Sequence, residues 1–288
     1  MPDKKIYLPD AETRLYGIVG DPVEHSLSPA MHNAAFRALG INAVYLAFCV
    51  TSAESAVRAI RDLNIQGVSV TIPHKESMIQ FLDQADEFVS AIGAVNTIKN
   101  RDGRLCGTNT DWIGAVKALQ EKAAIEGKRA VVLGAGGSAR AVVYGLRRHG
   151  AEVHVANRTV EKAERLASEF GCTFSGLDRL HEITGDILVN TTSVGMAGPS
   201  GAGKGQMPIA PETAGQFSVV MDIVYSPLKT RLLEEAEARG AEVIDGLRML
   251  LHQALAQFEF WTGKSAPKQV MEEALYSAYK ARDRSKKS

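Results

Sequence analysis

Two hydroxyl groups precede a helical pattern near the front of the chain. Ser26 and Ser28 stand two residues apart, and Pro29 follows Ser28 directly. Because Ser is a favoured N-cap and Pro a favoured first helical residue, Ser28 is predicted to cap this helix. Capping would explain Ser28, but not Ser26 or the nearby polar residues His32 and Asn33. Since unpaired amides at a helix N-terminus attract anions, the two hydroxyls predict a carboxylate-binding site.

A lysine follows the end of a predicted strand in the segment GVSVTIPHKE. The apolar run ends at Thr71, Pro73 stops it, and Lys75 comes two residues later. Ligands of α/β proteins bind in the crevice at the carboxyl ends of parallel strands. Lys75 is therefore a candidate for acid–base chemistry at a bound ligand.

Amide and carboxylate side chains cluster in two polar segments, GAVNTI and GTNTDW. These segments supply Asn96, Asn109 and Asp111. Asn and Asp in turns usually bond the local backbone, so that structural alternative stands for each of them alone. An ammonium and a carboxylate framed by hydroxyls and amides nevertheless suit a polyol that also reacts at a carbonyl or an alcohol.

The segment RAVVLGAGGSARA predicts a dinucleotide site. A buried-strand pattern ends at Gly134, and a helical pattern opens at Ser138. Gly134 permits a tight turn, Gly136 lets backbone amides approach a pyrophosphate, and the small Ala139 allows helix and strand to pack closely. A glycine-rich turn alone would be a weak signal, but a strand before it and a helix after it favour dinucleotide binding over a structural turn.

The end of the following strand indicates which dinucleotide binds. An NAD site usually carries an acidic residue there, which bonds the ribose 2′-hydroxyl. Here Asn157, Arg158 and Thr159 occupy the position, and Lys162 follows. Two cations and no carboxylate favour a 2′-phosphate, and hence NADP. The alternative is a solvent-exposed helix start capped by Thr159.

Short apolar runs that alternate with helical patterns must position these residues. Strands are predicted at 15–19, 44–50 and 68–72 in the first part of the chain, and at 130–133, 152–156, 187–190, 219–223 and 242–244 in the second. Such alternation predicts βαβ units and parallel sheets covered on both faces. We expect one domain at 1–111, completed by the helices of 246–288 packing back on it, and a second at 112–245. The Gly-rich segment 197–206 is predicted to be a surface loop.

Composition restricts the class of protein. The 288 residues are 45% hydrophobic and 23% charged, which is typical of a globular chain of about two domains. Thirty-three basic residues balance 33 acidic ones, so neither nucleic acid nor an anionic membrane is an expected partner. No apolar run is long enough for a signal peptide or a membrane span. Three widely spaced cysteines predict neither a disulfide framework nor a metal site, and agree with a cytoplasmic enzyme.

Taken in order, these motifs resemble those of the shikimate dehydrogenases. The matching segments run from about Tyr16 to about Trp261: HSLSPAMHN, VTIPHK, GAVNT, NTD, GAGGSARA, NRT, NTTSVGM, DIVYSPLKT and DGLRMLLHQA. The resemblance implies a two-domain α/β fold, in which an N-terminal substrate domain is followed by a Rossmann-like NADP-binding domain. It implies NADPH-dependent, reversible reduction of 3-dehydroshikimate to shikimate, a step of aromatic amino-acid biosynthesis.

The resemblance also implies roles for individual residues. Lys75 and Asp111 would form the catalytic pair, and Ser26 and Ser28 would hold the substrate carboxylate, approached by Tyr225. The substrate hydroxyls would be held by Thr71, Lys75, Asn96, Asp111 and Gln253. The cofactor would be held by Gly134, Ala135, Gly136, Gly137, Ser138, Asn157, Arg158, Thr159, Lys162, Thr191, Ile223, Gly246 and Met249, with Glu87 near it.

Two departures and two alternatives remain. Ser69 and Lys162 stand where the family often has Asn and Arg, but neither change removes a presumed catalytic group. One alternative is a dual quinate/shikimate dehydrogenase, whose relatives tend to use NAD. The other is a non-catalytic regulator that binds shikimate-like ligands. A small-molecule substrate is the expected partner, and the chain is expected to be a monomer or a homodimer.

Overall fold

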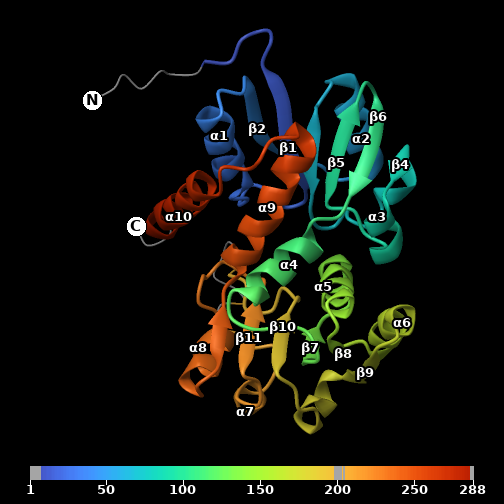
Figure 1. Ribbon diagram of the computed structural model, residues 1–288, viewed down its shortest axis with the longest axis vertical. Coiled ribbons are helices and arrows are strands. Elements are labelled where there is room, and N and C mark those ends of the chain that lie inside the picture. The colour runs from blue at the N-terminus through green and yellow to red at the C-terminus, as the bar shows by residue number, and fades with distance from the viewer. Residues whose placement is uncertain (1–7, 198–202, 204, 286–288) are drawn as a thin grey trace. The chain divides into compact units, whose positions relative to one another are not determined.

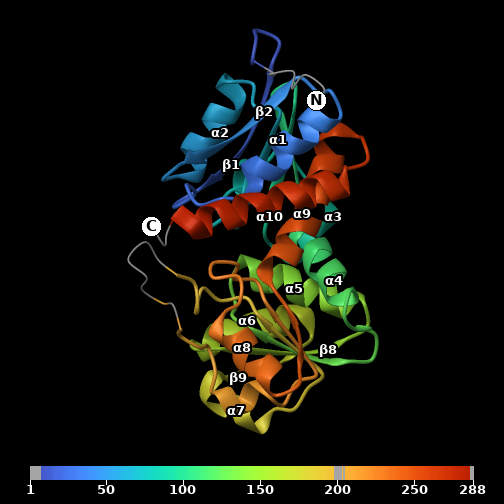
Figure 2. The same ribbon diagram turned by 90° about the vertical axis from the view of Figure 1, so that its left-hand side faces the viewer.

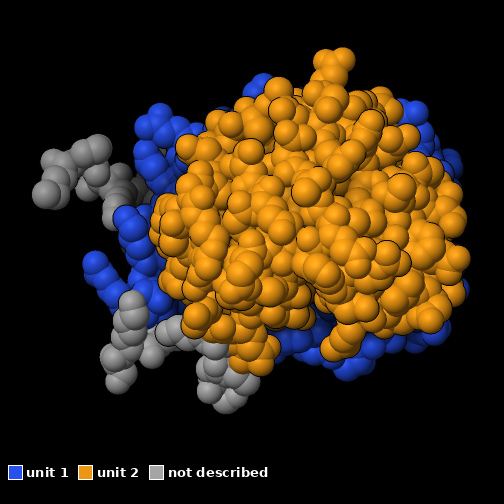
Figure 3. Space-filling model, turned by 90° about the horizontal axis from the view of Figure 1, so that it is seen from below, with its two compact units in different colours: residues 1–110, 254–288 blue, residues 111–253 orange. Residues whose placement is uncertain are grey.

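The computed structural model describes residues 8–197, 203 and 205–285, which form two compact units (Figures 1 and 3). Unit 1 contains residues up to 110 and from 254 onward, and unit 2 contains residues 111–253. The first junction lies one residue from its predicted place. The second lies inside helix α9 (Gly246–Thr262), eight residues beyond the predicted 245/246. The reason is that the first half of α9 packs on α4 (Asp111–Gln120): a Cβ at Gly114 would lie 2.8 Å from the Met249 carbonyl oxygen.

Unit 1 is built on a six-stranded mixed sheet in the order β2-β1-β3-β5-β6-β4. Its strands are β1 (Arg14–Gly20), β2 (Ala43–Cys49), β3 (Gly67–Val70), β4 (Gln84–Ala85), β5 (Thr97–Arg101) and β6 (Arg104–Thr108). Its helices are α1 (Ser28–Ala38), α2 (Ala53–Asp62), the 3-10 turn η1 (Ile79–Phe81), α3 (Glu87–Ile92), the second half of α9 and α10 (Lys268–Ser285). The second half of α9 and the whole of α10 belong to unit 1.

The antiparallel hairpin β5–β6 was not predicted, and it makes the first sheet mixed rather than parallel. Its turn is formed by Asp102 and Gly103, whose φ angles are +52° and +86°. Asp-Gly is a strong two-residue hairpin signal, because both positions need positive φ. That dipeptide in the sequence would have identified the hairpin.

Unit 2 is a doubly wound parallel sheet in the order β12-β11-β10-β7-β8-β9. Its strands are β7 (Arg129–Leu133), β8 (Glu152–Asn157), β9 (Thr173–Gly176), β10 (Ile187–Asn190), β11 (Val219–Asp222) and β12 (Glu242–Ile244). Besides α4 and the start of α9, its helices are α5 (Gly137–Arg148), α6 (Val160–Phe170), η2 (Leu177–Glu182), α7 (Pro211–Ala214) and α8 (Arg231–Ala238). Chain progression reverses between β7 and β10, which is the Rossmann switch point where dinucleotides bind.

Apolar side chains cover both faces of each sheet. In unit 2, residues of α4, α5 and α6 pack on one face, and residues of η2, α7 and α8 on the other. In unit 1, α2 and α3 contribute to the core on one face. On the opposite face α1 lies beside α10 (Figure 2), and an aromatic cluster joins α1 to α9. The candidate site residues follow or precede the ends of these strands.

All eight predicted strands are present, with ends within two residues of those observed. Most of the predicted loop 197–206 lies outside the described residues. Within the described ranges, no helix is both long and apolar enough to cross a membrane.

Candidate active site

Five candidate substrate residues lie at one edge of the unit 1 sheet. The parallel strands β1 and β3 end there. The loop after β1 carries Ser26 and leads to Ser28 at the start of α1, and the loop after β3 carries Thr71 and Lys75. Because β5 runs antiparallel to β3, the residue before β5, Asn96, lies at the same edge. The Val70 amide donates to the Asn96 carbonyl oxygen at 2.7 Å.

The two loops that leave β1 and β3 are bonded to each other. The Asp21 amide donates to the Ile72 carbonyl oxygen at 3.0 Å, and the Thr71 amide donates to the Val19 carbonyl oxygen at 3.0 Å. A Cβ at Gly20 would lie 2.3 Å from Thr71 Cγ2, so only glycine permits this approach. The close contact fixes Thr71 relative to the loop that carries the two serines.

Ser28 is not the N-cap of α1. Leu27 occupies that position with φ −93° and ψ −5°, and Ser28 and Pro29 are the first helical residues. The cap-like bond comes from Ser26 instead, whose hydroxyl accepts from the Ser28 amide at 3.2 Å. The helix begins one residue earlier than predicted because Leu27 already has αR backbone angles. Local backbone bonding therefore accounts for part of the role of Ser26.

His32 and Asn33 serve the fold. The Asn33 side chain bonds both backbone groups of Tyr45, at 2.8 Å each, and so ties α1 to β2. His32 is fully buried and stacks on the Tyr45 ring at 4.5 Å. Burial lowers the pKa of His32 to about 3, opposed in part by the side chain of Gln257, so the ring is neutral at pH 7.

The loop that carries Lys75 is fixed through its backbone. The Val95 amide donates to the Lys75 carbonyl oxygen at 2.8 Å, directly before Asn96. The adjacent His74 is buried, and its Nε2 lies 2.7 Å from the Val50 carbonyl oxygen. The half-buried Lys75 therefore belongs to the same edge as Asn96.

Asp111, the other candidate catalytic residue, is the first residue of α4 in unit 2 and is 5% exposed. A carboxylate in the first turn of a helix is stabilised by the helix dipole. The nearby Asn109 is fully buried, and the side-chain amide of Asn109 donates to the Ala94 carbonyl oxygen at 2.8 Å. This bond gives Asn109 a structural role, although its partner is a distant backbone group and not the local one that was expected.

The candidate cofactor residues of unit 2 follow the carboxyl ends of its parallel strands. At the switch point, Gly134 follows β7 and Thr191 follows β10. Gly134 has φ +110°, and a Cβ there would lie 2.6 Å from Thr191 Oγ1. The Thr191 hydroxyl donates to the Leu133 carbonyl oxygen at 2.6 Å. Glycine is thus required at 134 both for its backbone angle and for the close approach.

The N-terminus of α5 suits a pyrophosphate. Gly136 is its N-cap, and the helix begins at Gly137, one residue before the predicted Ser138. No side chain of the described residues caps this end, and no atom lies within 4 Å of where a Cβ of Gly136 would stand. Exposed backbone at a twelve-residue helix start, next to the switch point, fits the phosphates of a dinucleotide. The small Ala139 is buried against the sheet, as predicted.

The end of β8 presents cations to solvent. Arg158 and Lys162 are exposed. The side-chain amide of Asn157 donates to the Thr159 carbonyl oxygen at 2.9 Å. Thr159 occupies the N-cap of α6, but its side chain makes no cap hydrogen bond with the described residues. A helix start capped by the Thr159 side chain is therefore not what the structure shows.

A buried carboxylate missed by the sequence reasoning anchors the loops after β10 and β11. Asp222, fully buried, accepts from the Asn190 amide group at 3.0 Å, the Thr230 hydroxyl at 2.7 Å and the Val224 amide at 3.0 Å. Burial raises its pKa to about 6. These loops also carry Thr191, Ile223 and Tyr225. An Asp at the end of a buried strand was the available signal.

The remaining candidates are distributed over both units. A Cβ at Gly246 would lie 2.4 Å from the Ile223 carbonyl oxygen, which brings the start of α9 against the end of β11. Met249 and Gln253 are buried on α9, and the side-chain amide of Gln253 donates to the Leu250 carbonyl oxygen at 2.9 Å. Glu87, in contrast, is an exposed first-turn residue of α3 in unit 1.

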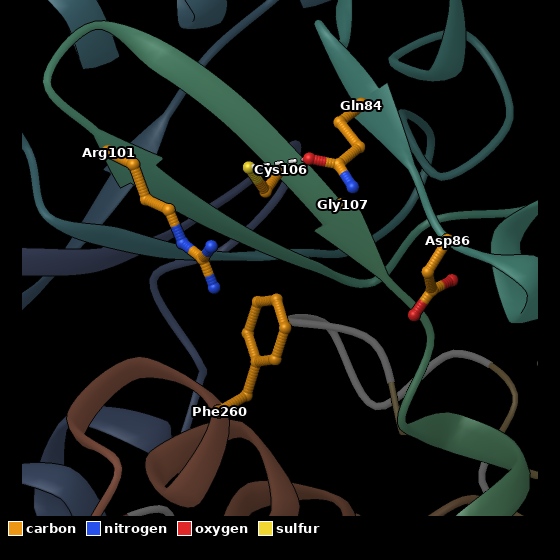
Figure 4. A pocket seen from close by; sticks show the side chains of 6 residues that line it. All are labelled: Gln84, Asp86, Arg101, Cys106, Gly107 and Phe260. Atoms are coloured by element: carbon orange, nitrogen blue, oxygen red, sulfur yellow. Dashed lines mark hydrogen bonds between the residues drawn. The ribbon is translucent and has the colours of Figure 1, made fainter.

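A small pocket of about 90 Å³ lies elsewhere in unit 1. Figure 4 shows the residues that line it, which come from β4, β5, β6, α9 and the N-cap of α3: Gln84, Asp86, Arg101, Cys106, Gly107 and Phe260. The Cys106 thiol donates to Gln84 Oε1 at 3.7 Å. None of these residues is a predicted site residue.

Three family models match successive parts of the chain. They are the shikimate dehydrogenase substrate binding domain at residues 18–98, shikimate/quinate 5-dehydrogenase at 116–222 and the shikimate 5′-dehydrogenase C-terminal domain at 246–276. A shikimate dehydrogenase (NADP(+)) of Thermococcus kodakarensis is 51% identical over 88% of this chain and 93% of its own length. The chain belongs to the shikimate dehydrogenase family.

Other shikimate dehydrogenases agree over nearly the full length. The NADP(+) enzyme of Methanopyrus kandleri is 46% identical, over 92% of this chain and 96% of its own. A crystal structure of a shikimate dehydrogenase with NADP+ has a TM-score of 0.85 at 42% identity, covering 94% of this chain and 97% of its own. The Thermus thermophilus enzyme, solved with NADP(H) and shikimate, has a TM-score of 0.83 at 39% identity, covering 92% and 100%.

Proposed function

We propose that this shikimate dehydrogenase family member reversibly reduces 3-dehydroshikimate to shikimate with NADPH. The observation that carries the proposal is that one sheet edge gathers Ser26, Ser28, Thr71, Lys75 and Asn96. These residues offer hydroxyls to a carboxylate, an ammonium to a reacting oxygen and an amide to a ring hydroxyl. That set matches the functional groups of shikimate.

Lys75 and Asp111 are the proposed catalytic residues. NADPH, when bound, supplies the hydride that reduces the C3 carbonyl. Negative charge then develops on the carbonyl oxygen, and the Lys75 ammonium stabilises that charge and holds a proton next to it. Asp111 orients the ammonium and accepts a hydrogen bond from a substrate hydroxyl.

The substrate is oriented by neutral donors and acceptors. Ser26 and Ser28 donate to the carboxylate, with Tyr225 near it, while Thr71, Asn96 and Gln253 bond the ring hydroxyls. Holding both ends of a rigid ring fixes C3 relative to Lys75, and such positioning lowers the barrier of the chemical step.

We propose that NADP binds at the carboxyl ends of the parallel strands of unit 2. The amides at the start of α5, from Gly134 to Ser138, bind the pyrophosphate, and Arg158 and Lys162 bind the 2′-phosphate. Thr191 and Ile223 follow β10 and β11, and Gly246 and Met249 lie at the start of α9. These residues and Glu87 are proposed to contact the cofactor. The NADP complexes of related enzymes support this assignment.

The test is a four-way assay that pairs shikimate or quinate with NADP+ or NAD+. The expected result is rapid reduction of NADP+ with shikimate and much slower reaction in the other three mixtures. Comparable rates with quinate and NAD+ would instead identify a dual quinate/shikimate dehydrogenase. Shikimate binding without turnover would identify a regulator. The relatives named as NADP(+) enzymes support the first outcome.

We also propose a cytoplasmic location and a monomeric or homodimeric state. The described cysteines, Cys49, Cys106 and Cys172, are all free, as expected in a reducing compartment. Light scattering coupled to size-exclusion chromatography measures the oligomeric state, and cell fractionation tests the location.

A further inference from the structure

We infer that Gln257 is a positioning residue that holds two substrate-binding side chains in register through a buried polar chain. The inference rests on the proposed function, because it takes Ser28 and Asn96 as substrate ligands. This polar chain is a series of six interacting side chains of unit 1, each no more than 5% exposed: Ser28, Tyr45, Ser69, Gln257, Thr97 and Asn96.

The first half of the chain crosses from α1 to α9. The Tyr45 hydroxyl interacts with the Ser28 side chain and donates to Ser69 Oγ at 2.6 Å. Burial raises the pKa of Tyr45 well above its usual value, so this hydroxyl keeps its proton. The Ser69 hydroxyl in turn donates to Gln257 Oε1 at 2.8 Å.

The second half reaches the substrate edge. Gln257 Nε2 donates to Thr97 Oγ1 at 3.0 Å and to the Asn96 carbonyl oxygen at 3.2 Å. The Thr97 hydroxyl donates to Asn96 Oδ1 at 2.7 Å, and the Thr110 amide donates to the same oxygen at 2.7 Å. Asn96 Nδ2 donates to Thr110 Oγ1 at 3.0 Å, which fixes both ends of this amide.

The orientation of the Gln257 side-chain amide is determined by its partners. The Asn96 carbonyl oxygen can only accept, so the nitrogen of the Gln257 amide must face it and its oxygen must face Ser69. With that orientation set, the Ser69 hydroxyl donates to Gln257 Oε1 and accepts from the Tyr45 hydroxyl. A group that donates on one side and accepts on the other is required at 257, and an aliphatic side chain of similar size would break the chain.

The placement of Gln257 links three elements that carry substrate groups. It lies on α9, one turn after Gln253, and contacts β3 through Ser69 and the start of β5 through Thr97. Deleting its bonds leaves buried partners unsatisfied at both ends, which is unfavourable because a buried donor or acceptor without a partner is not compensated for its lost hydration. The side chains of Asn96 and Ser28 are then no longer held in fixed positions relative to each other, although both residues are still present.

The test compares steady-state kinetics of four variants: Gln257→Leu, Tyr45→Phe, the double variant, and the control Phe258→Leu. Phe258 is fully buried on the same helix and packs on Phe36, outside the polar chain. We expect kcat/KM for shikimate to fall about 10-fold in Gln257→Leu, which removes hydrogen bonds on both sides of the side chain, and about 3-fold in Tyr45→Phe, which removes one. KM for NADP+ should stay within about twofold of wild type in both, whereas Phe258→Leu should lower Tm with little change in either constant.

The double variant tests the coupling. Because either substitution interrupts the same chain, the effects on kcat/KM for shikimate should be less than multiplicative. Multiplicative effects, an unchanged kcat/KM in Gln257→Leu, or equal losses for shikimate and NADP+ would each overturn the inference. If Gln257→Leu does not fold, Tyr45→Phe, which removes one oxygen atom, decides alone. A wild-type chain inactive on shikimate would overturn the proposed function and this inference together, whereas an active one isolates the inference.

Discussion

Lys75 is the residue on which the proposed chemistry depends most directly. General acid–base groups contribute about 10²–10⁴-fold to rate. We therefore expect Lys75→Ala to lower kcat at least about 100-fold, with a modest change in KM for shikimate. Steady-state kinetics with NADP+ and shikimate measure both constants. A large rise in KM with kcat intact would make Lys75 a binding residue only.

Arg158 is the residue that should distinguish the two nicotinamide cofactors. Its planar guanidinium can pair with a 2′-phosphate, which NAD lacks. Arg158→Ala should therefore weaken NADPH binding about 10-fold or more and leave NADH binding nearly unchanged, because a charge-assisted bond is worth roughly 1.5–3 kcal/mol. Fluorescence titration with each cofactor measures the difference. Equal losses for both would contradict the NADP assignment.

His32 predicts a pH dependence of stability. Its pKa in the folded chain is about 3, against an ordinary value of 6.5, so between these pH values the unfolded chain binds a proton that the folded one does not. Stability should fall as pH drops below about 6.5. In His32→Phe, which keeps a stacked ring against Tyr45, that contribution of up to about 1.4 kcal/mol per pH unit should disappear. Urea unfolding at pH 7, 6 and 5 gives both slopes, and parallel slopes would refute the prediction.

At the scale of elements, an ionic cluster joins the end of α4 to α9 within unit 2. Arg248 Nε donates to Glu121 Oε2 at 2.8 Å, its Nη2 also pairs with Glu121, and His252 Nε2 lies 2.8 Å from Glu121 Oε1. Hydrogen bonds from Arg248 are the main cause that lowers the pKa of Glu121 to about 2.

The sign of the expected pH effect follows from that lowered pKa. The cluster stabilises the fold fully above pH 4.5, the usual value for Glu, and the stabilisation is lost as pH falls towards 2. Glu121→Gln should cost roughly 1 kcal/mol at pH 7, since partial exposure screens the pairs, and the cost should shrink below pH 4.5. Denaturant unfolding of both proteins at pH 7 and pH 4 checks this. A cost that does not depend on pH would show that the charge of Glu121 contributes nothing.

The sequence predicted some structural elements better than others. Strands of unit 2 are continuous apolar runs because both faces of the sheet are buried, so their positions could be predicted. The hairpin β5–β6 was missed, since its strands contain Lys99, Asn100 and Arg104, and an apolar-run criterion passes over them. The N-cap of α1 was misplaced by one residue because cap preference does not reveal the backbone angles of Leu27.

The candidate site was predicted in the same uneven way. Residues at strand ends, such as Lys75 and Gly134, follow from local pattern. Asp222 had a local signal at the end of a buried strand, whereas Gln257 depends on contacts between segments far apart in the chain, which no local spacing in the sequence encodes. The role of Lys75 and Asp111 as a pair stays a prediction.

At the scale of the whole molecule, ligand binding should raise stability. A ligand that binds only the folded chain stabilises it by about 2.7 kcal/mol at 100 times its dissociation constant. NADP+ and shikimate should each raise Tm. The NADP+ effect should be smaller in Arg158→Ala at the same cofactor concentration, while the shikimate effect should be unchanged. Thermal denaturation scans of wild type and variant test this, and an equal NADP+ shift in both would contradict the role of Arg158.

The exposed position of Arg158 and Lys162 has a practical consequence for biocatalyst design. Neither side chain belongs to the hydrophobic core of unit 2, and the glycine turn proposed to bind the pyrophosphate follows another strand, β7. Exchanging the surface residues after β8 for acidic ones can therefore shift the cofactor preference from NADP towards NAD without repacking the interior. The same fold can be adapted to whichever reductant is cheaper to regenerate.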